Sequence, residues 1–396
     1  MGSDEVPHLD GGLSGTVNPV TSADESPLSG VDLRALPKIS LHDHLDGGVR
    51  PATIIELGEA NGVDVPVSDP DGLADWFYTQ CNAGSLVEYL KTFDLSTAVM
   101  QTEEGLVRIA REFVQDLAAD GVIYGEVRWA PEQHLTRGLS LDAVVEAVQE
   151  GIELGIKDAA HSGSDIQIGQ LVTAMRHADR ALEIAELAVR HRERGVVGFD
   201  IAGAEAGFPA SKHRLAFDYL AAELFPVTVH AGEADGIESI RSAMLDGRAL
   251  RLGHGVRIAE DIFIERDDAE SLYATLGPVA EWVRDRKIPL ELSPQSNLQT
   301  GAIAAWGEEL EDHPFDLLYQ LDFAVTVNVD NRTMSDTSLT KELALLSEAF
   351  DYDLTDLETF QLNAAAATFQ PLEIREALAD RISEAFDEFL DDDDKD

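Results

Sequence analysis

The sequence predicts an α/β protein, a TIM-type (β/α)8 barrel in a single domain. Short apolar or β-branched runs alternate with longer helical patterns along most of the 396-residue chain, and eight of the short runs qualify as strands. Eight is the number that closes a barrel. Unusual polar residues also gather at the C-terminal ends of these runs, where the active sites of barrels lie. The same alternation fits an open doubly wound sheet, which is the alternative fold.

The predicted elements follow one another without a linker or a short internal repeat, which favours one domain. The expected strands are the runs 39–42, 122–128, 166–173, 196–201, 227–230, 251–253, 289–292 and 323–328. Helical patterns separate most of them, the clearest at 103–117, 141–156, 180–192 and 279–285. We therefore assign the barrel to residues 31–385.

Both ends of the chain fall outside the predicted barrel. Residues 1–30 are rich in Gly, Ser, Asp and Pro without a strand or helix period, so they predict a disordered leader. Residues 386–396 end in a run of aspartates and predict a solvated acidic tail. No stretch has the apolar length of a signal-peptide core or a membrane span, and the single cysteine, Cys81, excludes an internal disulfide. These features favour a cytoplasmic protein.

The charge of the chain restricts its partners. Asp and Glu number 75 against 29 Lys and Arg, which gives a formal net charge of −46. Nucleic acid and anionic membrane surfaces are therefore unsuitable partners, because binding either one needs clustered basic side chains. Since 44% of the residues are hydrophobic, the chain can bury a core, and a small molecule is the expected ligand. The sequence leaves the oligomeric state open.

Three histidines and an aspartate lie at the ends of predicted strands. His42 and His44 are separated by one residue, so at a strand end their side chains share a face and can reach one ion. His230 ends the fifth predicted strand, and Asp330 follows the eighth. Each residue alone has an ordinary structural explanation, but together they predict a site for a zinc-like metal ion.

Two further residues at strand ends suit proton transfer. Glu233 comes shortly after the fifth strand, and His254 ends the sixth between two glycines that permit close approach of a ligand. Carboxyl and imidazole groups are the usual groups of general acid–base catalysis. The sequence therefore predicts that both residues serve a metal-dependent reaction.

At these residues the chain resembles the adenosine deaminase family of metal-dependent hydrolases, in particular its bacterial-type members. The resemblance covers residues 36–371. Its specific blocks, which also keep the family order, are PKISLHDHLDG at 37–47, GFDIAG at 198–203, HAGE at 230–233, LGHG at 252–255 and NVDN at 328–331. The family fold is a β/α barrel. The resemblance implies an enzyme of purine salvage that hydrolyses adenosine, and 2′-deoxyadenosine, to inosine and ammonia.

The resemblance also implies a metal centre. His42, His44, His230 and Asp330 would hold one Zn²⁺ per chain, and zinc lowers the pKa of a water that it binds toward neutrality. Related two-metal hydrolases resemble the chain at the first His-x-His but bridge their ions with a modified lysine at the end of strand four. Here that end reads DIAG, without a lysine. One metal is therefore expected, with Asp200 outside its ligands.

The same resemblance implies which groups face the substrate. His254 would orient the attacking water and take or steer its proton, and Glu233 would donate a proton to purine N1. Gly203 would offer its backbone N–H to purine N3, and Asp46 would accept a hydrogen bond from a ribose hydroxyl. Asn331 stands where familiar members have a second aspartate facing purine N7. Its amide can donate to N7 without first binding a proton.

A segment between the first two predicted strands is a candidate lid. Leu86, Tyr89, Leu90 and Phe93 have the spacing i, i+3, i+4 and i+7, which makes one apolar stripe of a helix. Such a stripe is core by default. Because the family carries a helical lid over the nucleoside at this place, contact with the substrate is the other interpretation.

Other charged residues and histidines are expected to be structural. Glu126 and Arg128 share one face of the second strand and are expected to pair with each other. His177 is expected to be a hydrogen-bonded structural histidine. The polar, helix-edge histidines predicted to lie on the surface are His134, His161, His191 and His313.

Two other functions fit parts of the pattern. A free-adenine deaminase would share the fold and the metal site, because Asp46 and the lid do not establish that ribose is required. A noncatalytic nucleoside-binding relative would be expected to lose Glu233 or His254, and the chain has both. AMP is disfavoured as a substrate because no cluster of Arg or Lys for a phosphate is evident.

Overall fold

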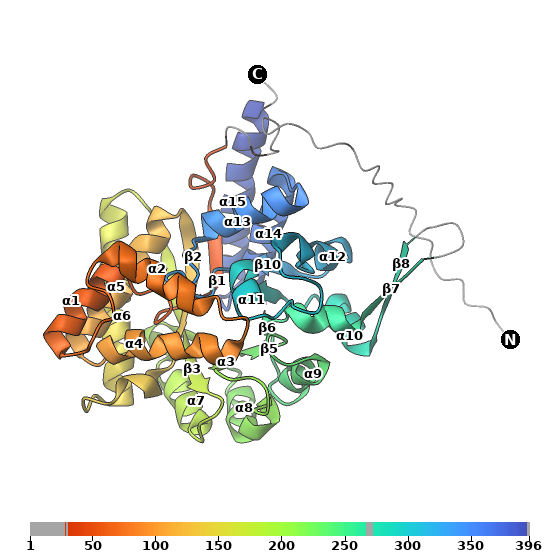
Figure 1. The fold of residues 1–396 in the computed structure, drawn as a ribbon. Coiled ribbons are helices and arrows are strands. Elements are labelled where there is room, and N and C mark those ends of the chain that lie inside the picture. The colour runs from red at the N-terminus through yellow and green to blue at the C-terminus, as the bar shows by residue number, and fades with distance from the viewer. Residues whose placement is uncertain (1–27, 29–30, 267–271, 394–396) are drawn as a thin grey trace.

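A computed structural model of the protein describes Leu28 and residues 31–266 and 272–393 (Figure 1). The predicted disordered leader, apart from Leu28, lies outside the described residues. In the described residues no helix is both long and apolar enough to cross a bilayer.

Eight parallel strands form the centre of the molecule, as predicted. They are β1 (Lys38–His44), β2 (Val122–Trp129), β3 (Gln167–Met175), β4 (Val196–Ala202), β5 (Thr228–Ala231), β6 (Arg251–His254), β9 (Leu290–Leu292) and β10 (Val325–Val327). Four pair in the order β1-β2-β3-β4 and four in the order β10-β9-β6-β5. Parallel bridges from Asp43 to Asp330 and from Phe199 to Val227 join the two sheets at both seams. The sheet therefore closes into a barrel and is not an open doubly wound sheet.

Helices surround the strands (Figure 1). The α-helices are α1 (Pro51–Asn61), α2 (Pro70–Cys81), α3 (Leu86–Tyr89), α4 (Phe93–Val99), α5 (Glu103–Ala119), α6 (Leu141–His161), α7 (Ala181–Arg190), α8 (Arg214–Ala222), α9 (Ile237–Leu245), α10 (Pro278–Asp285), α11 (Pro294–Gln299), α12 (Phe315–Gln320), α13 (Leu339–Phe350), α14 (Leu354–Ala367) and α15 (Leu372–Asp393). The 3₁₀ turns are η1 (Leu90–Thr92), η2 (Pro131–His134), η3 (Arg192–Arg194), η4 (Ala210–His213), η5 (Val256–Asp261) and η6 (Leu310–Asp312).

Side-chain caps fix where several of these helices begin. Thr102 accepts a hydrogen bond from the N–H of Gly105 at the start of α5, and Ser140 accepts one from Ala143 at the start of α6. The two helices pack closely because α6 carries glycine at the contact. A Cβ at Gly151 would lie 2.3 Å from the carbonyl oxygen of Val107. This packing covers the outside of the barrel beside β2.

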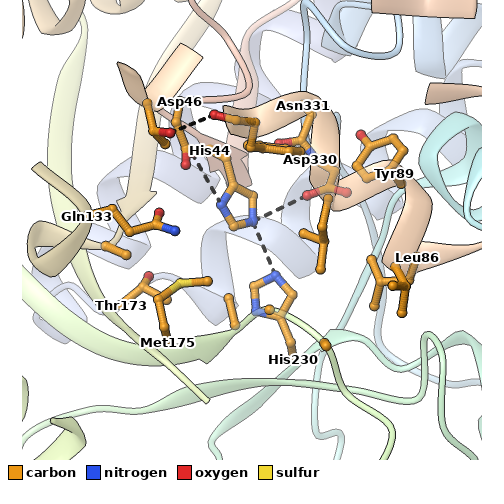
Figure 2. Close-up of a pocket in the computed structure, with 18 of the residues that line it drawn as sticks. His44, Asp46, Leu86, Tyr89, Gln133, Thr173, Met175, His230, Asp330 and Asn331 are labelled. Carbon is orange, nitrogen blue, oxygen red and sulfur yellow. Dashed lines mark hydrogen bonds and ion pairs between the residues drawn. The ribbon is translucent and has the colours of Figure 1, made fainter. Parts of the chain in front are cut away.

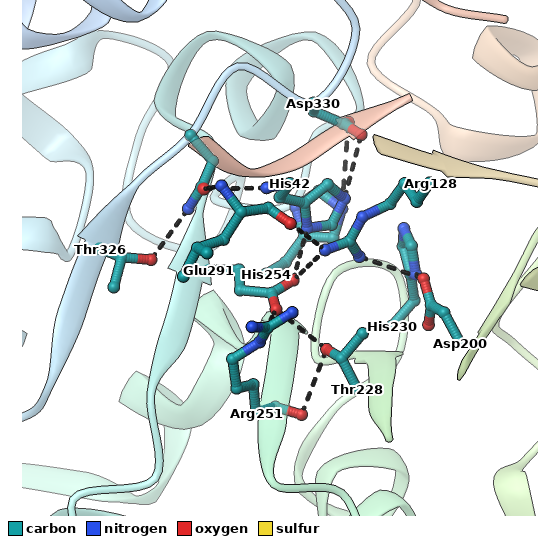
Figure 3. Close-up of polar contacts among 12 residues, drawn as sticks. His42, Arg128, Asp200, Thr228, His230, Arg251, His254, Glu291, Thr326 and Asp330 are labelled. Atoms are coloured by element: carbon teal, nitrogen blue, oxygen red, sulfur yellow. Dashed lines mark hydrogen bonds and ion pairs between the residues drawn. The ribbon is translucent and has the colours of Figure 1, made fainter. Parts of the chain in front are cut away.

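The interior of the barrel is charged as well as apolar (Figure 3). Glu126 and Arg128 both point inward, but the prediction that they pair with each other is wrong. Glu126 pairs with Arg251 at 2.5 Å, whereas Arg128 pairs with Glu291 at 2.6 Å and with Asp200 at 3.1 Å. Residues two apart on a strand are spaced along its axis, so each meets partners on strands across the barrel instead. All five side chains are buried, and the pairing compensates for their lost hydration.

Two segments depart from the expected pattern. An antiparallel hairpin of β7 (Ile262–Arg266) and β8 (Leu272–Leu276), which the sequence analysis missed, projects from the barrel (Figure 1). The boundary placed at residue 386 falls inside α15, and the Phe386 side chain is fully buried in the core. Phe386 therefore belongs to the folded domain, because its apolar ring anchors the helix despite the acidic residues around it.

A buried glutamate in α13 should make stability depend on pH. Glu342 is 1% exposed and accepts hydrogen bonds from Thr337 Oγ1 at 2.7 Å and from the N–H of Gln295 at 3.3 Å. Burial raises its pKa from 4.5 to about 8. The folded protein therefore keeps a proton that the unfolded chain releases, so this stabilisation is present at low pH and is lost as the pH rises through about 8.

The Glu342→Gln variant has no titrating group at this position. We therefore expect its melting temperature to increase relative to that of the wild type as the pH rises from 5 to 8. The gain in unfolding free energy relative to wild type should reach about 3 to 4 kcal/mol over this pH range. Thermal unfolding at several pH values measures it. Glu348→Gln, an exposed change on the same helix, is the control. A difference between Glu342→Gln and wild type that is constant with pH would contradict this account.

Candidate active site

A cavity of about 450 Å³ opens at the C-terminal ends of the barrel strands (Figure 2). This volume is in the usual range for a small-molecule site. Twelve of the thirteen residues that the sequence analysis selected as site residues line it. They are His44, Asp46, Leu86, Tyr89, Leu90, Phe93, Gly203, His230, Glu233, His254, Asp330 and Asn331. The thirteenth, His42, is fully buried directly behind the cavity wall.

Three imidazoles converge on the carboxylate of Asp330. Its Oδ1 lies 3.2 Å from His42 Nε2 and 3.3 Å from His44 Nε2. His44 Nε2 is in turn 3.2 Å from His230 Nε2, and a dashed line joins the two rings in Figure 2. Residues from β1, β5 and the end of β10 thus bring four ligand atoms to one point. Ring nitrogens and a carboxylate at such spacing suit a four-coordinate metal ion.

Carboxylates behind this cluster orient two of the rings (Figure 3). Glu291 Oε2 lies 3.0 Å from His42 Nδ1, and Asp200 Oδ2 lies 2.9 Å from His230 Nδ1. A carboxylate on one ring nitrogen keeps the proton there and leaves the other nitrogen free to bind a metal. His42 Nε2 is buried and makes no hydrogen bond of regular geometry in the described residues, and its 3.2 Å approach to Asp330 Oδ1 is that expected of two ligands of one ion. The donor set therefore fits a metal ion, and Asp200 supports the centre from outside it.

His254 lies beside the cluster, close enough to be considered as a metal ligand in place of His44. Ligand atoms of His42, His230, His254 and Asp330 all lie within 4.8 Å of one another, so distance alone allows His254 in place of His44. His254 Nε2, however, is 4.0 Å from Asp330 Oδ2 and 3.6 Å from Glu233 Oε2. His44 makes the shorter contacts with the cluster. His254 instead bridges the cluster and the glutamate.

A second glutamate, which the sequence analysis missed, holds the loop that carries Glu233. The buried Glu205 carboxylate accepts hydrogen bonds from the four successive N–H groups of residues 232–235, at 2.7 to 3.1 Å, and from Ser239 Oγ at 2.5 Å. Successive N–H groups form a nest for an anion. Glu205 lies two residues after the conspicuous block at 198–203. Its position just past the end of a barrel strand is the feature of the sequence that could have identified Glu205 as a site residue.

Burial sets the protonation of Glu233. Desolvation raises its pKa well above the ordinary value, and the nearby charges of Asp330 and Glu205 raise it further. A carboxyl group in such surroundings keeps its proton near neutral pH and can act as an acid.

The backbone is unusual at the residues of the site. His254 and Asp330 have φ of 60° and 58°, in the left-handed region that side chains rarely adopt. Gly203 has φ of 97°, and a Cβ there would lie 3.1 Å from Met175 Cε. Glycine therefore leaves the Gly203 backbone accessible to the cavity.

The candidate lid is built differently from the single helix that its spacing predicted. The segment divides into α3, the 3₁₀ turn η1 and α4, so it is not one uniform α-helix. Tyr89 and Leu86 are buried, whereas Leu90 and Phe93 are partly exposed. Because all four residues line the cavity, the stripe faces the site as well as the core.

Several histidines lie elsewhere than expected. His134, His191 and His313 are at most 3% exposed, so placing them on the surface is wrong; only His161 is exposed. Tertiary neighbours from distant parts of the chain cover them, which a local polar pattern cannot reveal. The prediction that His177 is a hydrogen-bonded structural residue is also wrong, because its side chain is exposed and lines the cavity.

The comparisons with known proteins agree with this geometry. The family model described as adenosine deaminase matches residues 37–385. The chain belongs to the adenosine deaminase family. An adenosine deaminase of Mycolicibacterium vanbaalenii is 52% identical over 90% of this chain and 97% of its own length. Adenosine deaminase 1 of Streptomyces coelicolor is 52% identical over 87% of this chain and 86% of its own length.

A solved amidohydrolase of Burkholderia ambifaria, described with bound Zn, shares the fold of this deaminase-family chain. Its TM-score is 0.77 at 22% identity, over 96% of this chain and 98% of that one. The bacterial-type resemblance and the barrel fold are both confirmed. The residues of the family blocks converge at one cavity, as the strand ends predicted.

Proposed function

We infer that the protein is an adenosine deaminase, a hydrolase that converts adenosine to inosine and ammonia. The observation that carries this function is the buried carboxyl of Glu233, placed between a His/Asp cluster and a nucleoside-sized cavity. The relatives that are about 50% identical to this chain are named adenosine deaminases. We extend the proposal to 2′-deoxyadenosine and to a role in purine salvage in the cytoplasm.

We propose that one zinc ion per chain is held by His42, His44, His230 and Asp330. Three neutral imidazoles and a carboxylate are typical zinc ligands, and Glu291 and Asp200 fix the tautomers that leave the coordinating nitrogens free. When bound, zinc supplies a nucleophile at neutral pH by lowering the pKa of water.

The residues of the chain supply the rest of the chemistry. Glu233 donates its proton to purine N1, which makes C6 more electrophilic. The Gly203 N–H faces purine N3, Asn331 donates its amide N–H to N7, and Asp46 accepts from a ribose hydroxyl. Burial raises the pKa of Asp46 to about 7, so this carboxyl can also hold a proton near neutrality. These contacts orient the ring with C6 toward the cluster.

A substrate panel tests the activity. Absorbance changes on adenosine, 2′-deoxyadenosine, adenine and AMP are compared before chelation, after chelation and after Zn²⁺ is restored. We expect turnover of the two nucleosides, its loss on chelation and its recovery with zinc. Faster turnover of adenine would assign the protein to the free-base reaction, and ligand binding without turnover of any of the four would indicate a noncatalytic relative.

We propose that the α3–α4 segment acts as a lid that excludes water from the nucleoside. Phe93 is partly exposed at the cavity and packs on Tyr89, with ring centroids 5.8 Å apart. Phe93→Ala should raise KM for adenosine about tenfold, because the variant loses apolar contact with the substrate. Steady-state kinetics measure the effect, and Leu182→Ala, an exposed apolar change on α7, is the control. Unaltered nucleoside affinity in Phe93→Ala would exclude the lid.

A further inference from the structure

A buried chain of hydrogen bonds leads from the backbone to the rear of His254. The N–H of Phe315 donates to His313 Nδ1 at 3.0 Å. His313 Nε2 lies 3.2 Å from Asn297 Oδ1, and Asn297 Nδ2 lies 3.0 Å from His254 Nδ1. His313, Asn297 and His254 are each at most 2% exposed. Solvent therefore does not compete for these contacts.

The direction of each bond in this chain is determined. A backbone N–H only donates, so His313 Nδ1 accepts and carries no hydrogen. Burial lowers the pKa of His313 to about 3, so the ring is neutral and its single hydrogen is on Nε2. That N–H donates to the carbonyl of the Asn297 amide. The amide NH₂ must then donate to His254, and His254 Nδ1 is an acceptor.

We propose that Asn297 and His313 are positioning residues that fix His254 as the tautomer with hydrogen on Nε2. The other face of the His254 ring meets the cavity, with Nε2 3.6 Å from Glu233 Oε2. His254 thus presents a hydrogen-bond donor to the reacting atoms and stabilises negative charge there. Its neutral ring accepts no proton at Nε2 and cannot bind the metal through that nitrogen. His44 therefore completes the ligand set. The inference deepens the proposed deaminase function and rests on it for its kinetic consequence.

Asn297→Asp tests the proposal because the new side chain has the same shape but reverses the direction of the hydrogen bond to His254 Nδ1. An aspartate accepts at both oxygens, so it still accepts from His313 but requires a hydrogen on His254 Nδ1. In the zinc-loaded protein with ¹⁵N-labelled histidine, NMR reports which ring nitrogen carries hydrogen, and loss of the signals in His254→Gln assigns them. Wild type should show hydrogen on Nε2 and Asn297→Asp hydrogen on Nδ1.

Steady-state kinetics separate this positioning role from a loss of folding or of substrate binding. We expect kcat for adenosine to fall about 10²-fold in Asn297→Asp, while KM changes less than about threefold. His313→Gln should keep the wild-type tautomer and lose less activity, because glutamine can accept from Phe315 and donate to Asn297. Asn363→Asp, a half-buried change whose amide donates to Val325 and does not contact His254, is the matched control for the added charge.

Each outcome decides the question. Hydrogen on His254 Nδ1 in the wild type, or an unchanged tautomer in Asn297→Asp, would overturn the proposal. Melting temperature and metal content identify a variant that fails to fold, and then the wild-type spectrum alone decides. Because the tautomer is measured without turnover, absence of deamination by the wild type would refute the proposed function separately.

Discussion

His230→Ala is expected to lose its metal and at least about 10³-fold of its turnover together. His230 Nε2 lies 3.2 Å from His44 Nε2, and Asp200 lies 2.9 Å from its other nitrogen, so the variant removes one of the four proposed ligands. Metal analysis of the purified protein and an absorbance assay on adenosine measure both effects. Asp200→Asn should reduce metal affinity less, about 10- to 100-fold, because the ligand itself is kept.

The control for this prediction is His161→Ala. His161 is an exposed histidine at the end of α6, and its replacement should leave metal content and turnover at wild-type values. If His230→Ala keeps both its metal and full turnover, or if the active wild type contains no metal, the assigned centre is wrong. Loss of metal with retained turnover would contradict the metal requirement alone.

Glu233→Gln is expected to keep its metal and lose about 10³-fold in kcat. Glutamine has the same shape, so the contacts of residues 232–235 with Glu205 should persist. It cannot transfer a proton to purine N1, however. The pKa of Glu233, raised by burial and by Asp330, makes the wild-type side chain a proton donor at the pH of the assay.

Steady-state kinetics on adenosine and metal analysis measure this effect. Glu238→Gln, an exposed change in α9 five residues along the chain, should have wild-type kcat and KM. An increase in KM with unchanged kcat in Glu233→Gln would instead assign Glu233 to substrate binding.

The eight strands and the His/Asp cluster at their ends could be predicted because the signals are local. A buried β-branched run identifies a strand, and the step of one residue between His42 and His44 places both side chains on one face. Short sequence blocks shared with the family identified most of the residues that line the cavity. The 3₁₀ turn between α3 and α4 was not predictable in this way, since apolar residues keep nearly the same spacing whether or not such a turn interrupts the helix.

The residues that support the site were not predictable from local patterns. Glu291 and His42 are separated by 249 positions, yet the carboxylate determines which nitrogen of the ring is free. Glu291 occupies the middle of the short buried strand β9, where an isolated charge was the only clue.

The sequence by itself determined the barrel, the family and most of the side chains that line the cavity, because each is encoded in neighbouring residues. Only the tertiary structure decided that Arg128 pairs across the barrel, that Glu205 holds the Glu233 loop and that His313 lies behind His254. These contacts form only when the barrel closes. Burial then fixes both hydrogen-bond direction and protonation.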